Sequence, residues 1–242
     1  MPRTVTQEDH SFHFPIQAVA GLIALLSLVV IPSRGATLTL HPFSDGQGDK
    51  PFGSPNYVLI TPAVTSYNAT TFGNGEDHRA LLEFSLFDLP AGALVSSTTF
   101  SYQVSGLTYN TSQFPRLAFS LFDGGSDSAI AASDLTGSTF GSAFSTPITN
   151  TGAYATSLST SVFNGYTGSP GVANRLTSFV VGLRISQDVV GFQTQLYNSA
   201  YAIAHPSVIQ PTLTLTYTVP EPSSMTCLGI GACFLAWRRR RS

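Results

Sequence analysis

The long middle part of this chain contains no cysteine. Cys227 and Cys233 both lie near the C-terminus, so residues 36–218 hold no disulfide and no thiolate metal site. Charge is scarce as well, because Asp, Glu, Lys and Arg make up 10% of the residues and Lys50 is the single lysine. Nucleic-acid binding requires clustered basic side chains, so this composition argues against a nucleic-acid partner.

Motifs of enzymes are missing too. The string nearest to a nucleophile elbow, residues 137–141, has threonine where serine is required. Neither a phosphate-binding glycine loop nor an H-E-x-x-H zinc motif occurs, and His41, His78 and His205 are far apart in sequence. We therefore predict a protein without enzymatic activity or cofactor.

The N-terminal region has the pattern of a secretory signal peptide. Residues 16–31 are apolar except for Gln17 and Ser27, and Pro32 ends the run. The small residues Ser33 and Gly35 predict cleavage by signal peptidase after Gly35, which would make Ala36 the first residue of the mature protein. A retained membrane anchor is the alternative.

The C-terminal region combines three features in a fixed order. Val219, Pro220, Glu221 and Pro222 form an open, proline-rich segment, since proline can neither continue a helix nor donate to a sheet. Residues 223–237 carry no charge and would span roughly 22 Å as a helix, short of the roughly 30 Å of a bilayer core. An arginine cluster then keeps the terminus cytoplasmic under the positive-inside rule. Its members are Arg238, Arg239, Arg240 and Arg241.

This order of features resembles the PEP-CTERM sorting domain. The resemblance implies that an exosortase-type enzyme of the inner membrane recognises and processes the tail, and that the protein passes to the bacterial cell surface or its exopolysaccharide matrix. It also implies that the short transmembrane helix holds the protein in the membrane only transiently. An ordinary single-span anchor is the alternative.

The middle of the chain has a period of two, which is typical of β-strands. Turn sequences separate the strands, and no long amphipathic pattern occurs, although residues 157–166 could form a short helix. We predict an all-β domain over residues 36–218, a jelly-roll-like β-sandwich. Its expected strands include residues 37–41, 57–60, 80–87, 100–104, 117–121, 179–185, 191–197 and 213–219.

Parts of this region resemble a DNRLRE-type domain. The resemblance lies in the His78–Leu86 run, the turn at 89–93 with the strand at 97–104, and the closing runs 178–185, 197–204 and 210–217. It implies a sandwich of the carbohydrate-binding-module kind, found in extracellular proteins, and it names no ligand.

Few residues are candidates for a binding site. Two Asp-Gly segments place Asp45 and Asp49, and Asp123 and Asp127, where they could bind calcium, although such segments are also ordinary turns. Glu83 alternates with Leu82 and Phe84, which predicts a solvent-facing carboxylate with Arg79, four positions earlier on the same face, as its suggested partner. Several tyrosines in or beside predicted loops could stack on sugars or could seal the sandwich edges. They are Tyr67, Tyr109, Tyr154, Tyr166 and Tyr201.

Three functions fit this sequence. The first is a structural or adhesive component of the cell surface or exopolysaccharide layer. The second is a carbohydrate-binding module that holds a specific extracellular glycan. The third, an extracellular polysaccharide hydrolase, has the least support because paired carboxylates facing each other are not evident.

Overall fold

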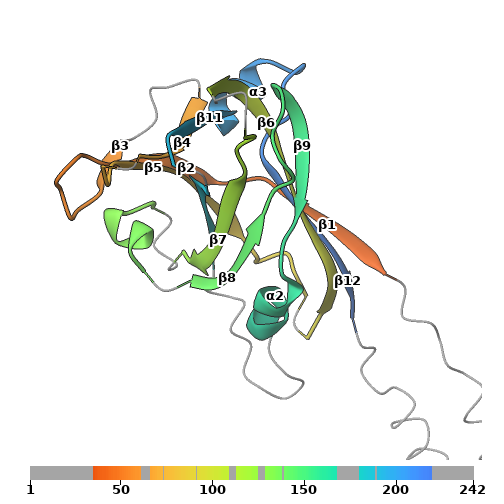
Figure 1. Ribbon diagram of the computed structural model, residues 1–242. Coiled ribbons are helices and arrows are strands. Elements are labelled where there is room, and N and C mark those ends of the chain that lie inside the picture. Colours follow the sequence, from red (N-terminus) through yellow and green to blue (C-terminus); the bar gives the residue numbers. More distant parts are fainter. Residues whose placement is uncertain are drawn as a thin grey trace, which may run out of the picture. The chain divides into compact units, whose positions relative to one another are not determined.

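The computed structural model describes residues 35–60, 66–72, 74–90, 92–108, 113–124, 129–137, 139–167, 180–188 and 190–219. These residues form twelve strands, two α-helices and a 3-10 helix (Figure 1). The elements are β1 (Ala36–Leu40), β2 (Ser44–Lys50), β3 (Val58–Ile60), β4 (Ser66–Thr71), β5 (Asp77–Ser85), β6 (Leu94–Thr108), β7 (Leu117–Asp123), η1 (Ala132–Leu135), β8 (Thr139–Phe144), β9 (Gly152–Ser157), α2 (Thr160–Thr167), β10 (Val180–Gln187), β11 (Phe192–Tyr197), α3 (Ser199–Ala204) and β12 (Thr212–Thr218).

The strands make one curled antiparallel sheet. One part of it, which we name the β5 layer, contains β2, β3, β5, β10, β7 and β8. The other part, the β6 layer, contains β1, β12, β6 and β9. Strands β4 and β11 pair with each other and join the layers, since β4 also pairs with β5 and β11 with β6.

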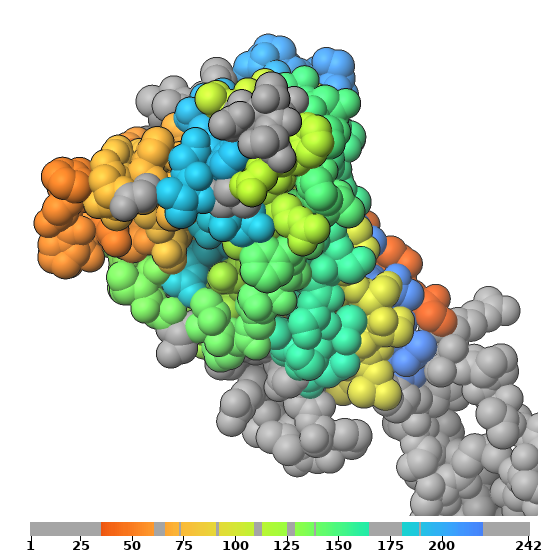
Figure 2. Space-filling view, in the orientation of Figure 1, coloured from red at the N-terminus to blue at the C-terminus, as the bar shows by residue number. Residues whose placement is uncertain are grey.

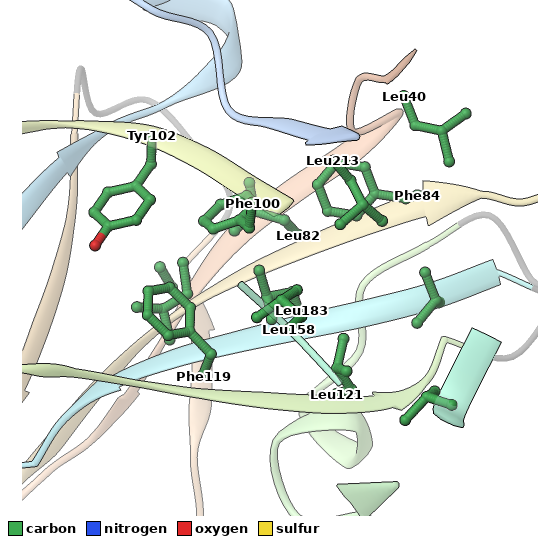
Figure 3. Close-up of a cluster of buried hydrophobic side chains, with 14 of the residues drawn as sticks. Leu40, Leu82, Phe84, Phe100, Tyr102, Phe119, Leu121, Leu158, Leu183 and Leu213 are labelled. Atoms are coloured by element: carbon green, nitrogen blue, oxygen red, sulfur yellow. The ribbon is translucent and has the colours of Figure 1, made fainter. Parts of the chain in front are cut away.

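Alternate residues of the two layers face each other across the main core (Figure 3). Phe100 of β6 contacts the rings of Phe84 on β5 and Phe119 on β7, with ring centroids 6.3 and 5.8 Å apart. Tyr102, two residues further along β6, also packs on Phe119. The period-two pattern therefore places one face of each strand in a shared core, as the sequence predicts.

A second, smaller core covers the outer face of the β5 layer. Leu81 and Phe122 are buried there beneath Leu135 of η1. Phe122 lies against the backbone at Gly182, where an added Cβ would come within 2.1 Å of the ring. The sheet is thus covered on both faces at this point, because glycine leaves room for an aromatic ring.

This second core overturns the expectation for Glu83. The carboxylate was predicted to face solvent, but Glu83 has an exposed fraction of 0%. Its neighbours across the strands are Ser44 on β2 and Gly182 on β10. The alternation correctly placed Glu83 opposite Leu82 and Phe84, but the outer face is covered as well. Arg79, its suggested partner, donates to the carboxylate of Asp77 and to the carbonyl oxygen of Leu135.

The predicted all-β class is confirmed, since strands dominate the described chain. The short helix expected near residues 157–166 is present as α2. Each strand expected from the alternation overlaps an observed one, whereas β2, β4, β8 and β9 were not anticipated. The closing run 197–204, which the DNRLRE resemblance implies to be a strand, is instead mostly helix α3. Among the described residues, no helix is long and apolar enough to cross a membrane. The predicted signal-peptide and C-terminal helices fall outside those residues.

Buried tyrosines should make the fold sensitive to alkali. Burial raises the pKa of Tyr102 to about 12, whereas an unfolded tyrosine ionises near about 10. The folded state therefore holds an extra proton between these pH values, so the stability from this group is complete below about pH 10 and is lost as the pH rises towards 12. Burial and the negative charge of Asp45 likewise raise the pKa of Tyr67.

We expect urea unfolding to show a free energy that falls by about 1.4 kcal/mol per pH unit for each such tyrosine above pH 10. Tyr102→Phe removes one titrating group, so the slope of the unfolding free energy against pH should become shallower by about 1.4 kcal/mol per pH unit. An unchanged slope in that variant would contradict the assignment.

Candidate functional site

The two ends of the folded body lie side by side, where red-orange and blue atoms are neighbours in Figure 2. Strand β1 pairs antiparallel with β12, and Ala36 is opposite Tyr217 (Figure 1). Gly35 is exposed just before β1, and Val219 is exposed just after β12. The chain therefore enters and leaves the body at the same end of one strand pair.

The predicted processing residues border this strand pair. Ala36, the expected first residue of the mature protein, is the first residue of β1. Val219 follows the last residue of β12 directly. Several other predicted residues lie outside the described ones: Ser33, Pro220, Glu221, Pro222, Arg238, Arg239, Arg240 and Arg241.

The calcium candidates have a different setting from the predicted one. Asp45 and Asp49 lie within β2 and not on a loop. Asp45 accepts a hydrogen bond from the Ser199 backbone, while Asp49 accepts one from Gln47 and contacts His78. Asp123 ends β7, and Asp127 lies outside the described residues. Within the described chain, no three His, Cys, Asp or Glu side chains are grouped so that they could hold a metal ion.

A polar cluster lies where β5 begins. His78 Nδ1 lies 2.6 Å from the Asp49 carboxylate, and its Nε2 lies 3.5 Å from that of Glu76. A histidine oriented by an aspartate supplies two of the three members of a hydrolytic triad. Here the second ring nitrogen faces a carboxylate and not a hydroxyl that could act as nucleophile, so this arrangement favours a structural role.

The outer side of the same strand carries a second polar group. The Tyr57 hydroxyl donates to Asp77, which also accepts from Arg79 at 2.8 Å. Burial and the hydrogen bond to Asp77 raise the pKa of Tyr57, although the positive charge of Arg79 acts in the opposite direction. The Arg79 guanidinium lies 4.9 Å from the centre of the Tyr57 ring. These side chains satisfy one another, which again favours a structural role.

The tyrosine candidates separate into different environments. Tyr67 lies in β4 and is buried, and Tyr154 lies in β9 with its hydroxyl bonded to Asn150. Both belong to the predicted alternative in which tyrosines seal the sandwich. Tyr109 and the side chain of Tyr166 lie outside what the structure describes.

Tyr201 has a surface setting. Its ring lies between those of Tyr197 and His205, with centroid separations of 4.9 and 3.8 Å and nearly parallel planes. We name these three residues the ring stack. The sequence reasoning missed Tyr197 and His205, although their spacing of four residues on either side of Tyr201 was visible. The stack is a candidate surface for sugar contact, since aromatic side chains combine apolar area with a polar group.

Residues 218–241 match the PEP-CTERM protein-sorting motif. This motif indicates a substrate of an exosortase-type sorting system, with export and membrane-associated sorting towards the cell surface. The match confirms the predicted sorting motif. No family model of the DNRLRE type matches the body. A comparison with curated proteins found no match to the chain.

Proposed function

We propose that this is a non-catalytic structural or adhesive protein of the bacterial cell surface or exopolysaccharide matrix. The observation that carries the proposal is the junction at residue 218, where β12 ends and the sorting motif begins. The sheet and the sorting motif therefore share only this boundary residue. In this proposal residues 36–218 are the delivered body, and the tail directs the body to its destination.

The position of β1 supports delivery of an intact fold. In the proposal, signal peptidase cleaves after Gly35, which leaves every residue of β1 paired to β12. Exosortase-type processing at Pro220–Pro222 would likewise leave β12 whole. Neither cleavage removes a strand, so the body keeps its core after both steps.

The body itself we propose to be a jelly-roll-like sandwich of the DNRLRE kind. Its β5 and β6 layers pack their alternating apolar residues against each other, which is the packing of sandwich folds. The absence of a catalytic role is part of the proposal, and it is supported by the internal bonding of His78, Asp49, Asp77 and Arg79.

Replacing Pro220 and Glu221 with alanine should hold the precursor in the inner membrane, because the segment that the exosortase-type enzyme recognises is lost. Cell fractionation gives the location, and intact mass gives the processing state of each fraction. Thr218→Ser, next to the motif, is the matched control and should be processed normally. Surface delivery of the double variant with the wild-type mature mass would show that the sorting assignment is wrong.

A second candidate function is the binding of a specific extracellular glycan. The ring stack at α3 favours it, since Tyr197, Tyr201 and His205 form a row of surface rings with polar atoms at their edges. Binding to a glycan that is lost in Tyr201→Ala would support this function over a purely structural one.

A further inference from the structure

Charge is distributed very unevenly between the two layers of the sheet. Strands β1, β6, β9 and β12 contain no Asp, Glu, Lys, Arg or His. By contrast, β2, β5 and β10 of the other layer carry acidic and basic side chains, among them Asp49, Lys50, Asp77 and Arg184. The β6 layer therefore presents an outer face that offers no ionic contact from its strands.

Small hydroxyl side chains occupy most of this outer face. On β12 they alternate with the buried Leu213 and Leu215, and on β6 they alternate with the buried Phe100 and Tyr102. We name the set the hydroxyl face. Its members are Thr37 and Thr39 on β1, Thr212, Thr214 and Thr216 on β12, Ser97, Thr99 and Ser101 on β6, and Ser157 on β9.

The register of the strands aligns these hydroxyls in rows. One row runs across four strands through Thr39, Thr214, Thr99 and Ser157. A second runs through Thr37, Thr216 and Ser97. Neighbouring strands lie about 4.8 Å apart, and alternate residues of one strand about 6.7 Å apart. The face is thus a regular grid of hydroxyl groups.

The hydroxyls of the grid are open to a partner. Thr37, Thr39, Ser97 and Ser157 are exposed, and the others are half-buried. Thr212 donates to the carbonyl oxygen of Gln210, whereas the remaining hydroxyls of the face make no hydrogen bond to another described residue. Each is therefore a donor and acceptor that water satisfies in the free protein.

The chemistry of the face selects the partner. Protein interfaces are enriched in aromatic residues, methionine and arginine, none of which contributes to this grid. Nucleic acids and acidic polymers require cations, which the face lacks. An uncharged polymer rich in hydroxyls matches the bonding capacity of the face and its lack of charge. We infer that the hydroxyl face binds a neutral polysaccharide along its length.

This inference rests on the proposed function and identifies the surface that would perform it. Each hydrogen bond exchanges a contact with water for one with the sugar, so a single bond adds little net free energy. Binding then depends on several bonds formed at once by one rigid sheet. Because no ion pair takes part, affinity should change little with salt concentration.

The test uses the full chain in a non-sugar detergent, mixed with microcrystalline cellulose or chitin as neutral probes and with calcium alginate as an acidic one. Wild-type protein should bind a neutral probe with little effect of salt. The triple variant Thr39→Val, Thr99→Val and Thr214→Val keeps the side-chain shape and removes three hydroxyls of one row. Its affinity should fall about tenfold or more.

Two matched triple variants complete the test. The variant with Thr39→Ser, Thr99→Ser and Thr214→Ser keeps the hydroxyls and should retain binding. Valine in place of the exposed Thr139, Thr146 and Thr149, which lie in β8 and after it, should not affect binding. Valine favours strands, so the thermal midpoint of the face variant should not fall.

Several outcomes would overturn the inference. The wild type could fail to bind either neutral probe, or could bind only alginate in a salt-sensitive manner. The face and control variants could lose affinity for the neutral probe equally. Tyr201→Ala could lose this affinity while the face variant keeps it. Dimerisation abolished by the face variant would assign the surface to a second copy of the chain. Cell fractionation shows whether the same variants reach the cell surface, and this result tests the proposed function separately.

Discussion

Phe100→Ala is expected to lower the free energy of unfolding by about 3–5 kcal/mol. Phe100 has an exposed fraction of 0% and contacts the rings of Phe84, Tyr102 and Phe119. Phe84 and Phe119 belong to the opposite layer, so the ring joins the two layers where they face each other. Removal of the ring leaves a cavity between rigid strands that cannot close fully.

The effect is large relative to the whole stability of a domain, which is about 5–15 kcal/mol. The body also has no disulfide to limit the consequences. Urea unfolding followed by fluorescence or circular dichroism measures the change. Phe87→Ala is the matched control, because Phe87 is 71% exposed and its removal should cost less than about 0.5 kcal/mol. Equal losses in the two variants would contradict the assignment of the core.

Strands that bury one apolar face were predictable from the sequence, and those made of turn residues were not. Alternation in β6, β7, β10 and β12 identifies the residues of the main core. Strand β2 has the sequence Ser-Asp-Gly-Gln-Gly-Asp-Lys, which is typical of a turn. It is a strand because β5 and β3 pair with it and because Gly48 leaves space for Leu135, which an added Cβ would approach within 2.2 Å.

Burial on a second face was the other feature that periodicity missed. The odd positions of β5 include Leu81 as well as Glu83, and that leucine was the available signal that both faces are covered. The covering segment, η1, is more than forty residues away in sequence. Contacts of this kind depend on how strands are ordered in the sheet, which local patterns do not encode.

The candidate sites also differ in how far the sequence alone predicts them. The sorting motif is a linear signal, so its order of residues was sufficient to identify it. The ring stack and the hydroxyl face depend on three-dimensional neighbours. The alternation of threonine and leucine in β12 predicts that its threonines share a face, but only the register with β1 and β6 aligns them in rows.

Arg184→Leu should lower the free energy of unfolding by about 2–4 kcal/mol, because hydrogen bonds from a charged donor contribute about 1.5–3 kcal/mol each. Arg184 is 4% exposed and donates to the carbonyl oxygens of Leu135 and Gly137, at 2.6 and 3.1 Å. Its guanidinium also lies 5.0 Å from the centre of the Phe122 ring. Burial and the nearby charge of Arg79 lower the pKa of Arg184.

The loss should be concentrated in the segment that Arg184 holds. Without the guanidinium, the Gly137 carbonyl oxygen loses its donor, and the Leu135 carbonyl oxygen keeps only the longer hydrogen bond from Arg79. Limited proteolysis of the variant should therefore cut within residues 129–137 before the main core opens, because local segments unfold at lower cost than the whole domain. Arg116→Leu, at an exposed position, is the matched control and should change stability by less than about 0.5 kcal/mol. If Arg184→Leu unfolds like the wild type and resists cleavage in this segment, the Arg79 hydrogen bond and the apolar contacts of Leu135 are sufficient to hold η1, and Arg184 does not stabilise it.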